Sequence, residues 1–247
     1  MSRHASDRLA RRLACHQALH DPAREPRNTL RWLPELRRWQ SARLEAGFAQ
    51  FLSNPRSAPA ARFFLTDVYG DHDFSRRDAD IARVLPMMRG LLPVALLDTV
   101  TDGIELGALT HAFDLRMADA LQRVAPRRRK LDGALYAQAY REVELPRLRE
   151  HQIELLGLVG HGLADALAMP GMSTLLKFSR GPAKVAGLAE LQGFLERGFT
   201  AFAELGDVEG FIDQIDRNER ELLQRLFDGD EDPFAGSDFA ARQPRRR

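Results

Sequence analysis

The sequence has few cysteines and no long apolar runs. A single cysteine, Cys15, occurs among 247 residues. It excludes an intramolecular disulfide and a metal site built only from cysteines, and is typical of a protein from a reducing compartment. No apolar run approaches the roughly 20 residues needed to cross a bilayer, and the Arg-studded segment 1–20 lacks the apolar core of a signal peptide. We therefore expect a cytoplasmic protein with no membrane span.

The sequence also lacks an excess of charge of either sign. Its formal net charge is +1, so the whole chain has no strong attraction for nucleic acid or for an anionic membrane. Two basic runs, 127–130 and 245–247, have no interleaved aromatic residues and are more typical of a solvated linker and tail. We expect no specific nucleic-acid binding. Three lysines against many arginines, with abundant alanine, indicate a GC-rich bacterial genome.

Alternating strand patterns and fixed-period repeats are absent, whereas apolar residues recur at helical spacing through most of the chain. We expect an all-α, single-domain bundle of about eight to ten helices over residues 1–227, with an internal linker at 126–131 and a disordered charged tail over 228–247. The expected helices cover about 6–20, 34–52, 59–69, 76–88, 93–124, 146–168, 183–204 and 207–227, with shorter helices after Asp132 and up to Phe178. We expect the range 93–124 to hold two helices, divided near Asp102 or Gly107. We also expect a break at Gly181-Pro182.

The most informative stretch is the predicted short helix 59–69. Pro59 can begin it, because the missing proline N–H is unused in a first turn, and Gly70 can end it in the left-handed conformation. Apolar residues cover about two thirds of the helix circumference. We therefore expect a core helix in which Phe64 and Val68 are almost fully buried.

Asp67 falls inside the apolar arc of this helix. A carboxylate there needs a fixed cationic partner to offset its desolvation, and we expect Arg76 or Arg77 to supply it. The following loop adds His72 and Asp73, residue types suited to a metal or general-base site, and Arg76 and Arg77 at the start of the next helix could hold an anion. Short polar loops of this kind are more often turns and caps.

The segment Phe63 to Tyr69 reads FFLTDVY and resembles the signature of the bacterial FFLEELY-motif proteins. The following YGDHDFSRRDAD and the later FLERGF are similar to the same family, so the resemblance runs from about Leu36 to Phe227. The sequence departs from the motif at Thr66, where the family has Glu, at a position expected to face solvent. The resemblance implies a helical fold and no reaction, because the family has no assigned function.

A second carboxylate, Glu219, interrupts the apolar stripe of the last predicted helix. Two interpretations stay open. Either an arginine pairs with Glu219 in a structural network, or Glu219 joins Asp67 in a polar pocket.

Three histidines are weak candidates for ligand binding. His16 and His20 lie one helical turn apart, a spacing that can chelate a metal, but the sequence indicates no third ligand. His161 lies among Gly157, Gly160 and Gly162, where small residues could admit a flat cofactor such as haem. Acidic residues share its side of the helix, which favours a solvated position. We predict neither a metal nor a cofactor.

The sequence contains no recognisable nucleophile with its base, no metal constellation and no glycine-rich phosphate loop. The favoured function is therefore a non-enzymatic helical scaffold or interaction protein, with a protein partner or self-association. The alternative is a protein, an enzyme included, that binds a small molecule or cofactor in a polar pocket around Asp67, His72 and Glu219. A deep pocket lined by these groups would favour the alternative, and an exposed apolar patch would favour the first.

Overall fold

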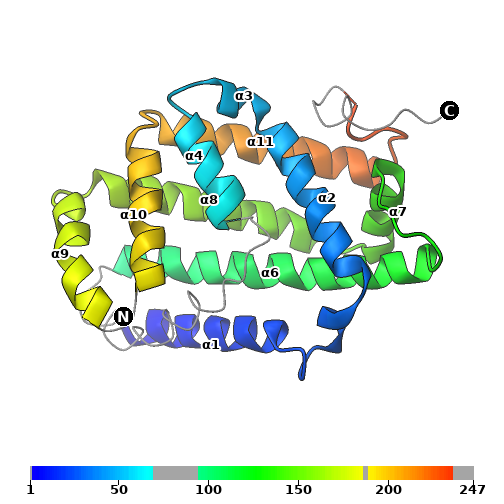
Figure 1. Ribbon diagram of the computed structural model, residues 1–247, viewed down its shortest axis with the longest axis horizontal. Helices are drawn as coiled ribbons and strands as arrows, with labels where there is room; N and C mark the ends of the chain where they lie inside the picture. The colour runs from blue at the N-terminus through cyan, green and yellow to red at the C-terminus, as the bar shows by residue number, and fades with distance from the viewer. Residues whose placement is uncertain (1, 69–93, 186–188, 236–247) are drawn as a thin grey trace.

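The computed structural model describes residues 2–68, 94–185 and 189–235 (Figure 1). Within these ranges the chain forms ten α-helices, two short helical turns (η1 and η2) and no β-strand. The predicted all-α fold is confirmed. The elements are α1 (Ser2–His20), η1 (Pro26–Thr29), α2 (Trp32–Gly47), α3 (Ala49–Ser53), α4 (Ala58–Phe63), η2 (Phe64–Val68), α6 (Val94–Val124), α7 (Gly133–Val143), α8 (Pro146–Ala168), α9 (Met172–Val185), α10 (Ala189–Ala203) and α11 (Val208–Asp228).

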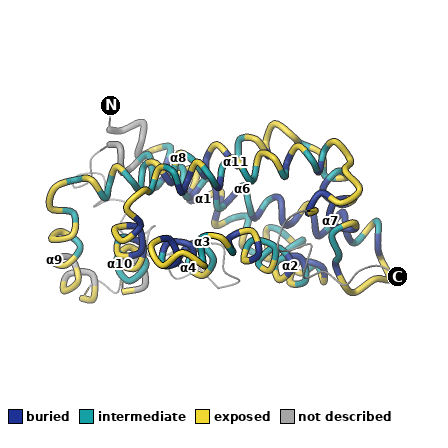
Figure 2. Tube along the Cα trace, turned by 90° about the horizontal axis from the view of Figure 1, so that it is seen from above, coloured by how far each residue is buried: buried dark blue, intermediate teal, exposed yellow. Residues whose placement is uncertain are grey.

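The helices form two layers. In one layer α1, α6, α8 and α11 lie side by side, each in contact with the next (Figure 1). In the view from above, α2, α3, α4 and α10 lie together on one side of these four helices (Figure 2). Helix α7 covers one end of the molecule, and α9 stands at the opposite end, where it packs mainly against α10.

Buried apolar residues form two clusters, one at each end of the bundle. The α7-end core includes Trp32, Trp39, Leu121 and Tyr136. The α4-end core combines aromatic rings from several helices with aliphatic side chains; its largest members are Phe48, Phe63, Phe64, Phe202 and Phe211. Because α6, α8 and α11 contribute to both clusters, the same long helices connect the two cores.

Helix α6 corrects the prediction of two helices divided near Asp102 or Gly107. The helix continues without a break because both residues serve its contact with α1. Asp102 accepts a hydrogen bond of 2.5 Å from Arg8. At Gly107 an added Cβ would lie 3.3 Å from the ring of His16, so glycine allows α1 to approach closely.

Two further helix boundaries differ from the prediction. Helix α9 continues to Val185 through the expected break at Gly181-Pro182. Pro182 has no N–H to donate to the carbonyl four residues earlier, which belongs to Phe178. Because Phe178 is highly exposed, water can donate to that carbonyl instead.

The expected helix 34–52 is divided at Phe48 into α2 and α3. The helix expected after Asp132 is α7, and Asp132 caps it by accepting a hydrogen bond from the Leu135 N–H.

The packed chain extends beyond the predicted boundary at residue 227. Gly229 ends α11 in the left-handed conformation, with φ of 78°. Phe234 is then buried beside Trp39, at 5.3 Å between ring centroids, and Arg225 donates to the carbonyls of Asp232 and Ala235. The prediction of disorder is therefore wrong for 229–235, because the chain turns back and places an aromatic ring in the core. Residues 236–247 lie outside the described residues.

The predicted linker at 126–131 is the loop that joins α6 and α7. It packs against α2: Arg31 donates to the Pro126 carbonyl, and the Leu131 N–H donates to Glu35 at 3.2 Å. Leu131 is buried in the α7-end core. The loop is thus fixed to the same core as the helices that it connects.

In the described ranges, no single helix is both long enough and apolar enough for a membrane span. Helix α8 and the first half of α9 reach the required length and composition only as a pair, which is bent by 88°.

Candidate functional site

Helix α4 and turn η2 carry the FFLTDVY residues as far as 68, and they pack against α10. Phe63 and Phe64 are buried, and their ring centroids lie 6.1 and 5.7 Å from that of Phe202. Thr66 is exposed, as expected. The predicted burial of Phe64 is confirmed, whereas the side chain of Val68 lies outside the described residues. The described part of this segment, residues 63–68, is therefore helical, and its two phenylalanines pack into the core.

Asp67 points towards α10 and meets an arginine there. The Arg197 Nε and Nη2 atoms donate to Asp67 Oδ1 at 2.8 and 2.5 Å, and the Thr66 hydroxyl donates to Oδ2 at 2.8 Å. The carboxylate side chain is 17% exposed and that of Arg197 is 57% exposed. An arginine partner is thus confirmed, although sequence reasoning missed Arg197. Four predicted site residues lie outside the described residues: His72, Asp73, Arg76 and Arg77.

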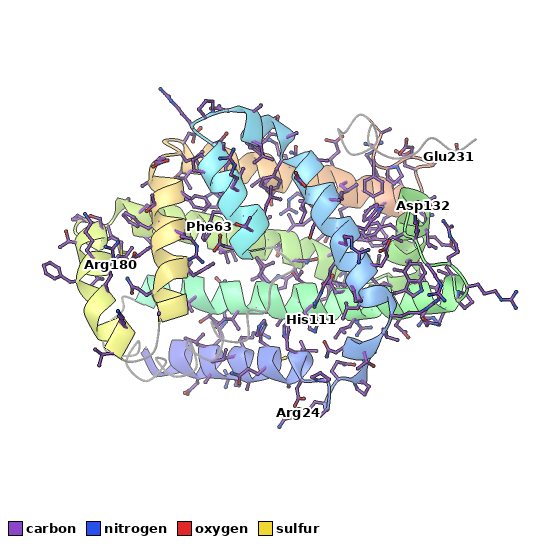
Figure 3. All side chains as sticks on the ribbon, viewed as in Figure 1. Arg24, Phe63, His111, Asp132, Arg180 and Glu231 are labelled. Atoms are coloured by element: carbon purple, nitrogen blue, oxygen red, sulfur yellow. The ribbon has the colours of Figure 1, made fainter. Side chains whose placement is uncertain are left out.

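The two segments that carry the family resemblance, FFLTDVY and FLERGF, contact each other directly. Besides the ion pair of Asp67 and Arg197, which are separated by 130 residues, the rings of Phe63 and Phe194 lie 5.3 Å apart. An added Cβ at Gly198 would lie 2.8 Å from Phe63, so only glycine leaves room for this ring. Figure 3 labels Phe63 at this contact between α4 and α10. Arg197 and Gly198 thus contribute to the same contact of α4 and η2 with α10, which we call the α4–α10 joint. This contact gives both motif segments a structural role.

Glu219 has a different arginine partner. Arg43 on α2 donates to both of its carboxylate oxygens, at 2.9 and 3.2 Å, and the two side chains are 17% and 26% exposed. This pair confirms the interpretation of Glu219 as part of a structural network. Asp67 is tied to α10 and Glu219 to α2, so the arginine partners of the two carboxylates lie on different helices.

His16 and His20 on α1 lie next to a third histidine, His111 on α6 (Figure 3). The His20 ring stacks on that of His111 at 3.9 Å and 17°, and the His16 and His20 rings lie 4.3 Å apart. His20 Nδ1 lies 2.9 Å from the carbonyl of His16. Among the described side chains, no group of three or more His, Cys, Asp or Glu has an arrangement that could hold a metal ion. The histidines form a stack between α1 and α6.

His111 is buried, and both its ring nitrogens are hydrogen-bonded. Nδ1 accepts from Arg37 at 2.9 Å, so Nε2 carries the proton and donates to Asn28 at 2.9 Å and to the Leu19 carbonyl at 3.2 Å. Burial lowers the pKa of His111 to about 3, and the nearby His20 and Arg37 act in the same direction. His111 is therefore a neutral, fixed structural histidine. Sequence periodicity could not single it out, because it lies on the same face as ordinary core residues.

A buried arginine, Arg149 on α8, was also missed. Its guanidinium lies 3.6 Å from the ring centroid of Phe113 and 4.3 Å from that of Tyr140. Arginine stacks well on aromatic faces, which compensates in part for its removal from water. Nearby, Asp114 accepts from Gln40 at 3.2 Å, and burial raises its pKa against the opposing effect of Arg37. These groups hold α2, α6, α7 and α8 together.

His161 lies on the exposed side of α8, with Nε2 3.6 Å from Asp213. The neighbouring glycines serve helix packing. An added Cβ at Gly160 would lie 2.6 Å from Ile212, and one at Gly162 would lie 2.2 Å from Thr99. The space that suggested a flat cofactor is thus filled by side chains of α11 and α6.

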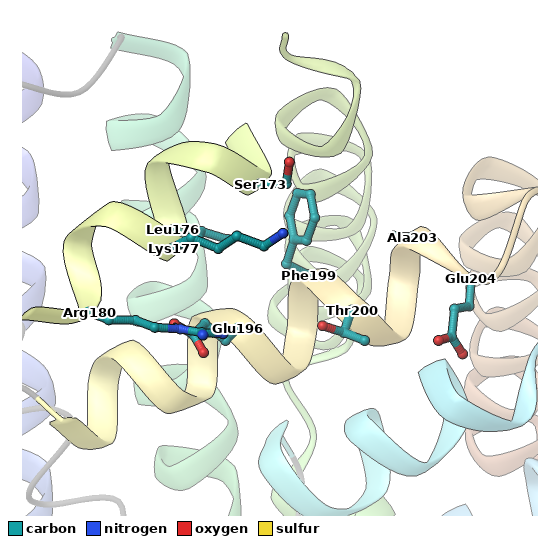
Figure 4. A pocket seen from close by; sticks show the side chains of 9 residues that line it. All are labelled: Ser173, Leu176, Lys177, Arg180, Glu196, Phe199, Thr200, Ala203 and Glu204. Carbon is teal, nitrogen blue, oxygen red and sulfur yellow. The ribbon is translucent and has the colours of Figure 1, made fainter. Parts of the chain in front are cut away.

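Two shallow hollows lie on either side of α10. The first, of about 310 Å³, lies between α9 and α10 and is lined by Lys177, Phe199 and Thr200, with the Arg180 and Glu196 ion pair at 2.6 Å across it (Figure 4). The second, of about 380 Å³, is lined by residues of α4, α9 and α10. Neither lining includes Asp67 or Glu219.

The outer face of α9 is apolar and exposed. We define the α9 stripe as Leu175, Phe178 and Val185, which are 55%, 78% and 92% exposed. The opposite side of the helix faces α10, where the Leu176 carbonyl accepts a hydrogen bond of 2.8 Å from Gln192. Figure 2 shows α9 as mostly exposed, in contrast to the body of the bundle. Sequence reasoning missed this stripe because it predicted a break inside α9.

No curated protein and no solved structure matches the chain. One protein family does match, over residues 19–233, from the end of α1 to the turn after α11. The matched range includes both motif segments, the whole of α9 and the ion pairs Asp67–Arg197, Glu219–Arg43 and Glu196–Arg180. The chain belongs to the family described as Domain of unknown function (DUF8198).

Proposed function

We propose that the protein is a non-enzymatic helical scaffold, which docks on another cell component through the outer face of α9. The observation that carries this proposal is the α9 stripe: Phe178 and Val185 are 78% and 92% exposed, although both side chains are apolar. Large exposed apolar groups that lie together on one element are typical of interaction sites. The stripe therefore requires a partner that the described residues do not supply.

The polar residues that suggested catalysis support the same proposal. Asp67 is bound by Arg197, Glu219 by Arg43, and His111 is kept neutral mainly by burial, which lowers its pKa. Groups engaged in this way stabilise helix contacts, and a catalytic acid or base needs access to a substrate proton. The alternative pocket around Asp67, His72 and Glu219 has less support, because the arginine partners of the two carboxylates lie on different helices.

The family resemblance fits this proposal. We propose that the chain is a FFLEELY-motif protein of bacterial origin that works in the cytoplasm. In support, the FFLTDVY and FLERGF segments form one joint between α4 and α10, so the motif has a structural role. That joint fixes α10, and α10 in turn supports α9.

Light-induced crosslinking in cells tests the docking proposal. A photoreactive phenylalanine derivative is placed at position 178, and the same derivative at position 158 provides the matched control. Leu158 on α8 is 54% exposed, close to the 55% of Leu175. We expect a discrete adduct from position 178 that is lost when Leu175→Ser is added. Equal labelling from both positions, or none from position 178, would contradict the proposal.

A further inference from the structure

We propose that the component contacted by the α9 stripe is an anionic lipid surface, on which α9 lies parallel to the membrane plane. This inference rests on the proposed docking function and names its partner. It concerns a surface-bound helix and requires no membrane span. Three observations carry it: the position of the apolar residues on α9, the charge of the helix, and its place in the fold.

The apolar residues of the stripe share one side of the helix. At 100° per residue, Leu175, Phe178 and Val185 fall within about 80° of one another. Leu176, about 100° from Leu175, faces α10 instead, and it lines the hollow between the two helices. The stripe therefore points away from the protein body, and three large apolar groups can enter an apolar medium together.

The charge of α9 is of one sign. Residues 172–185 contain Lys177, Arg180 and Lys184 and no Asp or Glu. Arg180 pairs with Glu196, whereas Lys177 and Lys184 are exposed. These two are among only three lysines in the entire sequence. They lie about 80° and 100° from Val185 and about 160° and 180° from Leu175, on the side of the helix that carries Arg180, and Lys177 lines the hollow against α10. Their positive charge therefore attracts an anionic surface across the width of the helix, a distance comparable with the Debye length.

The place of α9 in the fold favours a lipid surface over a protein partner. Helix α9 stands at one end of the bundle (Figure 1), and the side chains of its stripe are exposed there. A protein partner would need a matching groove with acidic groups on its rim, whereas a fluid bilayer adapts to a convex helix. A helix with Lys and Arg on one face and Leu and Phe on the other is typical of segments that lie in the headgroup region.

Vesicle co-sedimentation of the full chain provides the test. We compare vesicles of pure phosphatidylcholine with vesicles of equal parts phosphatidylcholine and phosphatidylglycerol. We expect binding to the anionic vesicles only, weakening as salt is raised because screening reduces attraction between exposed charges. Phe178→Ser should reduce binding about tenfold or more, given the apolar area that it removes. Lys177→Gln and Lys184→Gln should reduce binding about fivefold each.

Matched controls separate this effect from a general loss of folding or charge. Leu158→Ser removes a leucine of α8 that is about as exposed as Leu175. Lys130→Gln removes the third lysine, which lies in the loop between α6 and α7. Both variants should bind anionic vesicles as the unmodified protein does. Circular dichroism confirms that every variant keeps its helices.

Several outcomes would overturn the inference: no binding to either kind of vesicle, equal binding to both, or equal losses in the α9 and control variants. The crosslinking experiment keeps this result apart from the proposed function. If position 178 labels a protein or a second copy of the chain and vesicles do not bind, the lipid inference fails and the docking function stands. If position 178 labels nothing and vesicles do not bind, both fail.

Discussion

Helices α6 and α9 depart from the usual distribution of polar and apolar residues in opposite ways. Helix α6 carries polar side chains in the interior: His111 and Asp114 are only 3% and 8% exposed. Helix α9 carries apolar side chains in solvent: Phe178 and Val185 are 78% and 92% exposed. The two helices thus present the two most informative departures in a folded protein, a buried polar group and an exposed large apolar group.

The two helices differ in whether other parts of the chain provide partners for these unusually placed side chains. In α6 the ring nitrogens of His111 and the carboxylate of Asp114 find hydrogen-bond partners on α2 and in the segment 19–28. Buried polar groups that are satisfied in this way specify how helices pack. In α9 the exposed apolar side chains have no comparable cover among the described residues. The comparison therefore assigns the polar groups of α6 to structure and supports the proposal that α9 docks on a partner.

The largest expected effect comes from the same substitution made in each region. Phe64→Ala should lower the free energy of unfolding by about 3–5 kcal/mol, through lost transfer energy and a cavity. Phe178→Ala should change it by no more than about 0.5 kcal/mol, because its ring is already in water. Urea unfolding followed by circular dichroism measures both. A large loss from Phe178→Ala would show that α9 is part of the core, and the comparison would fail.

A buried ion pair gives the next largest effect. Arg43→Met alone leaves Glu219 partly buried without its cation, and we expect a loss of about 2–3 kcal/mol, less than for a fully buried pair. Combining Arg43→Met with Glu219→Leu should restore much of that stability, since no charge is then stranded. A double-mutant cycle in urea measures the coupling. Additive losses would show that the two residues act independently.

The buried histidine predicts a pH dependence. Because the pKa of His111 is lowered to about 3 from 6.5, the unfolded chain binds a proton that the folded chain excludes as pH falls below 6.5. The free energy of unfolding should therefore decrease by up to about 1.4 kcal/mol per pH unit between pH 6.5 and about pH 4.5. Asp114, whose pKa is raised above 3.8 by burial, acts in the opposite sense between pH 3.8 and that raised pKa.

The contribution of His111 is isolated by substitution. His111→Gln should flatten the dependence over this range, and His161→Gln, which alters an exposed histidine, should leave it unchanged. Unfolding curves recorded at several pH values provide the measurement. An unchanged slope in His111→Gln would show that another group is responsible.

The sequence predicted the fold class and the burial of Phe64, because helical periodicity and proline positions reflect local physics. It also predicted an arginine for Asp67, and an arginine was one of the two interpretations for Glu219, since a carboxylate on an apolar helix face requires a partner. It could not identify Arg197 or Arg43, because such partners depend on how helices cross. The break predicted at Gly181-Pro182 was wrong for a related reason: local propensity does not show whether water can reach the carbonyl that a proline leaves without a donor.

The glycines show the same limit of sequence reasoning. Gly107, Gly160 and Gly162 were read as a helix break or as room for a cofactor. Each instead allows a neighbouring helix to approach, with His16, Ile212 and Thr99 in contact. A small residue indicates a close approach, and only the tertiary structure shows what approaches.

The smallest expected effect concerns the motif carboxylate itself. From the sequence alone, Asp67→Ala would cost several kcal/mol, on the premise that an arginine is stranded in the core. In the structure Arg197 is 57% exposed, so water can solvate its guanidinium when Asp67 is removed. We therefore expect a loss of about 1 kcal/mol or less, and a coupling to Arg197→Ala that shrinks in high salt. A loss of several kcal/mol would instead indicate a second cation on Asp67. Cycles with Arg76→Ala and Arg77→Ala would then decide whether the helix is also fixed to the segment that follows it, as the sequence predicts.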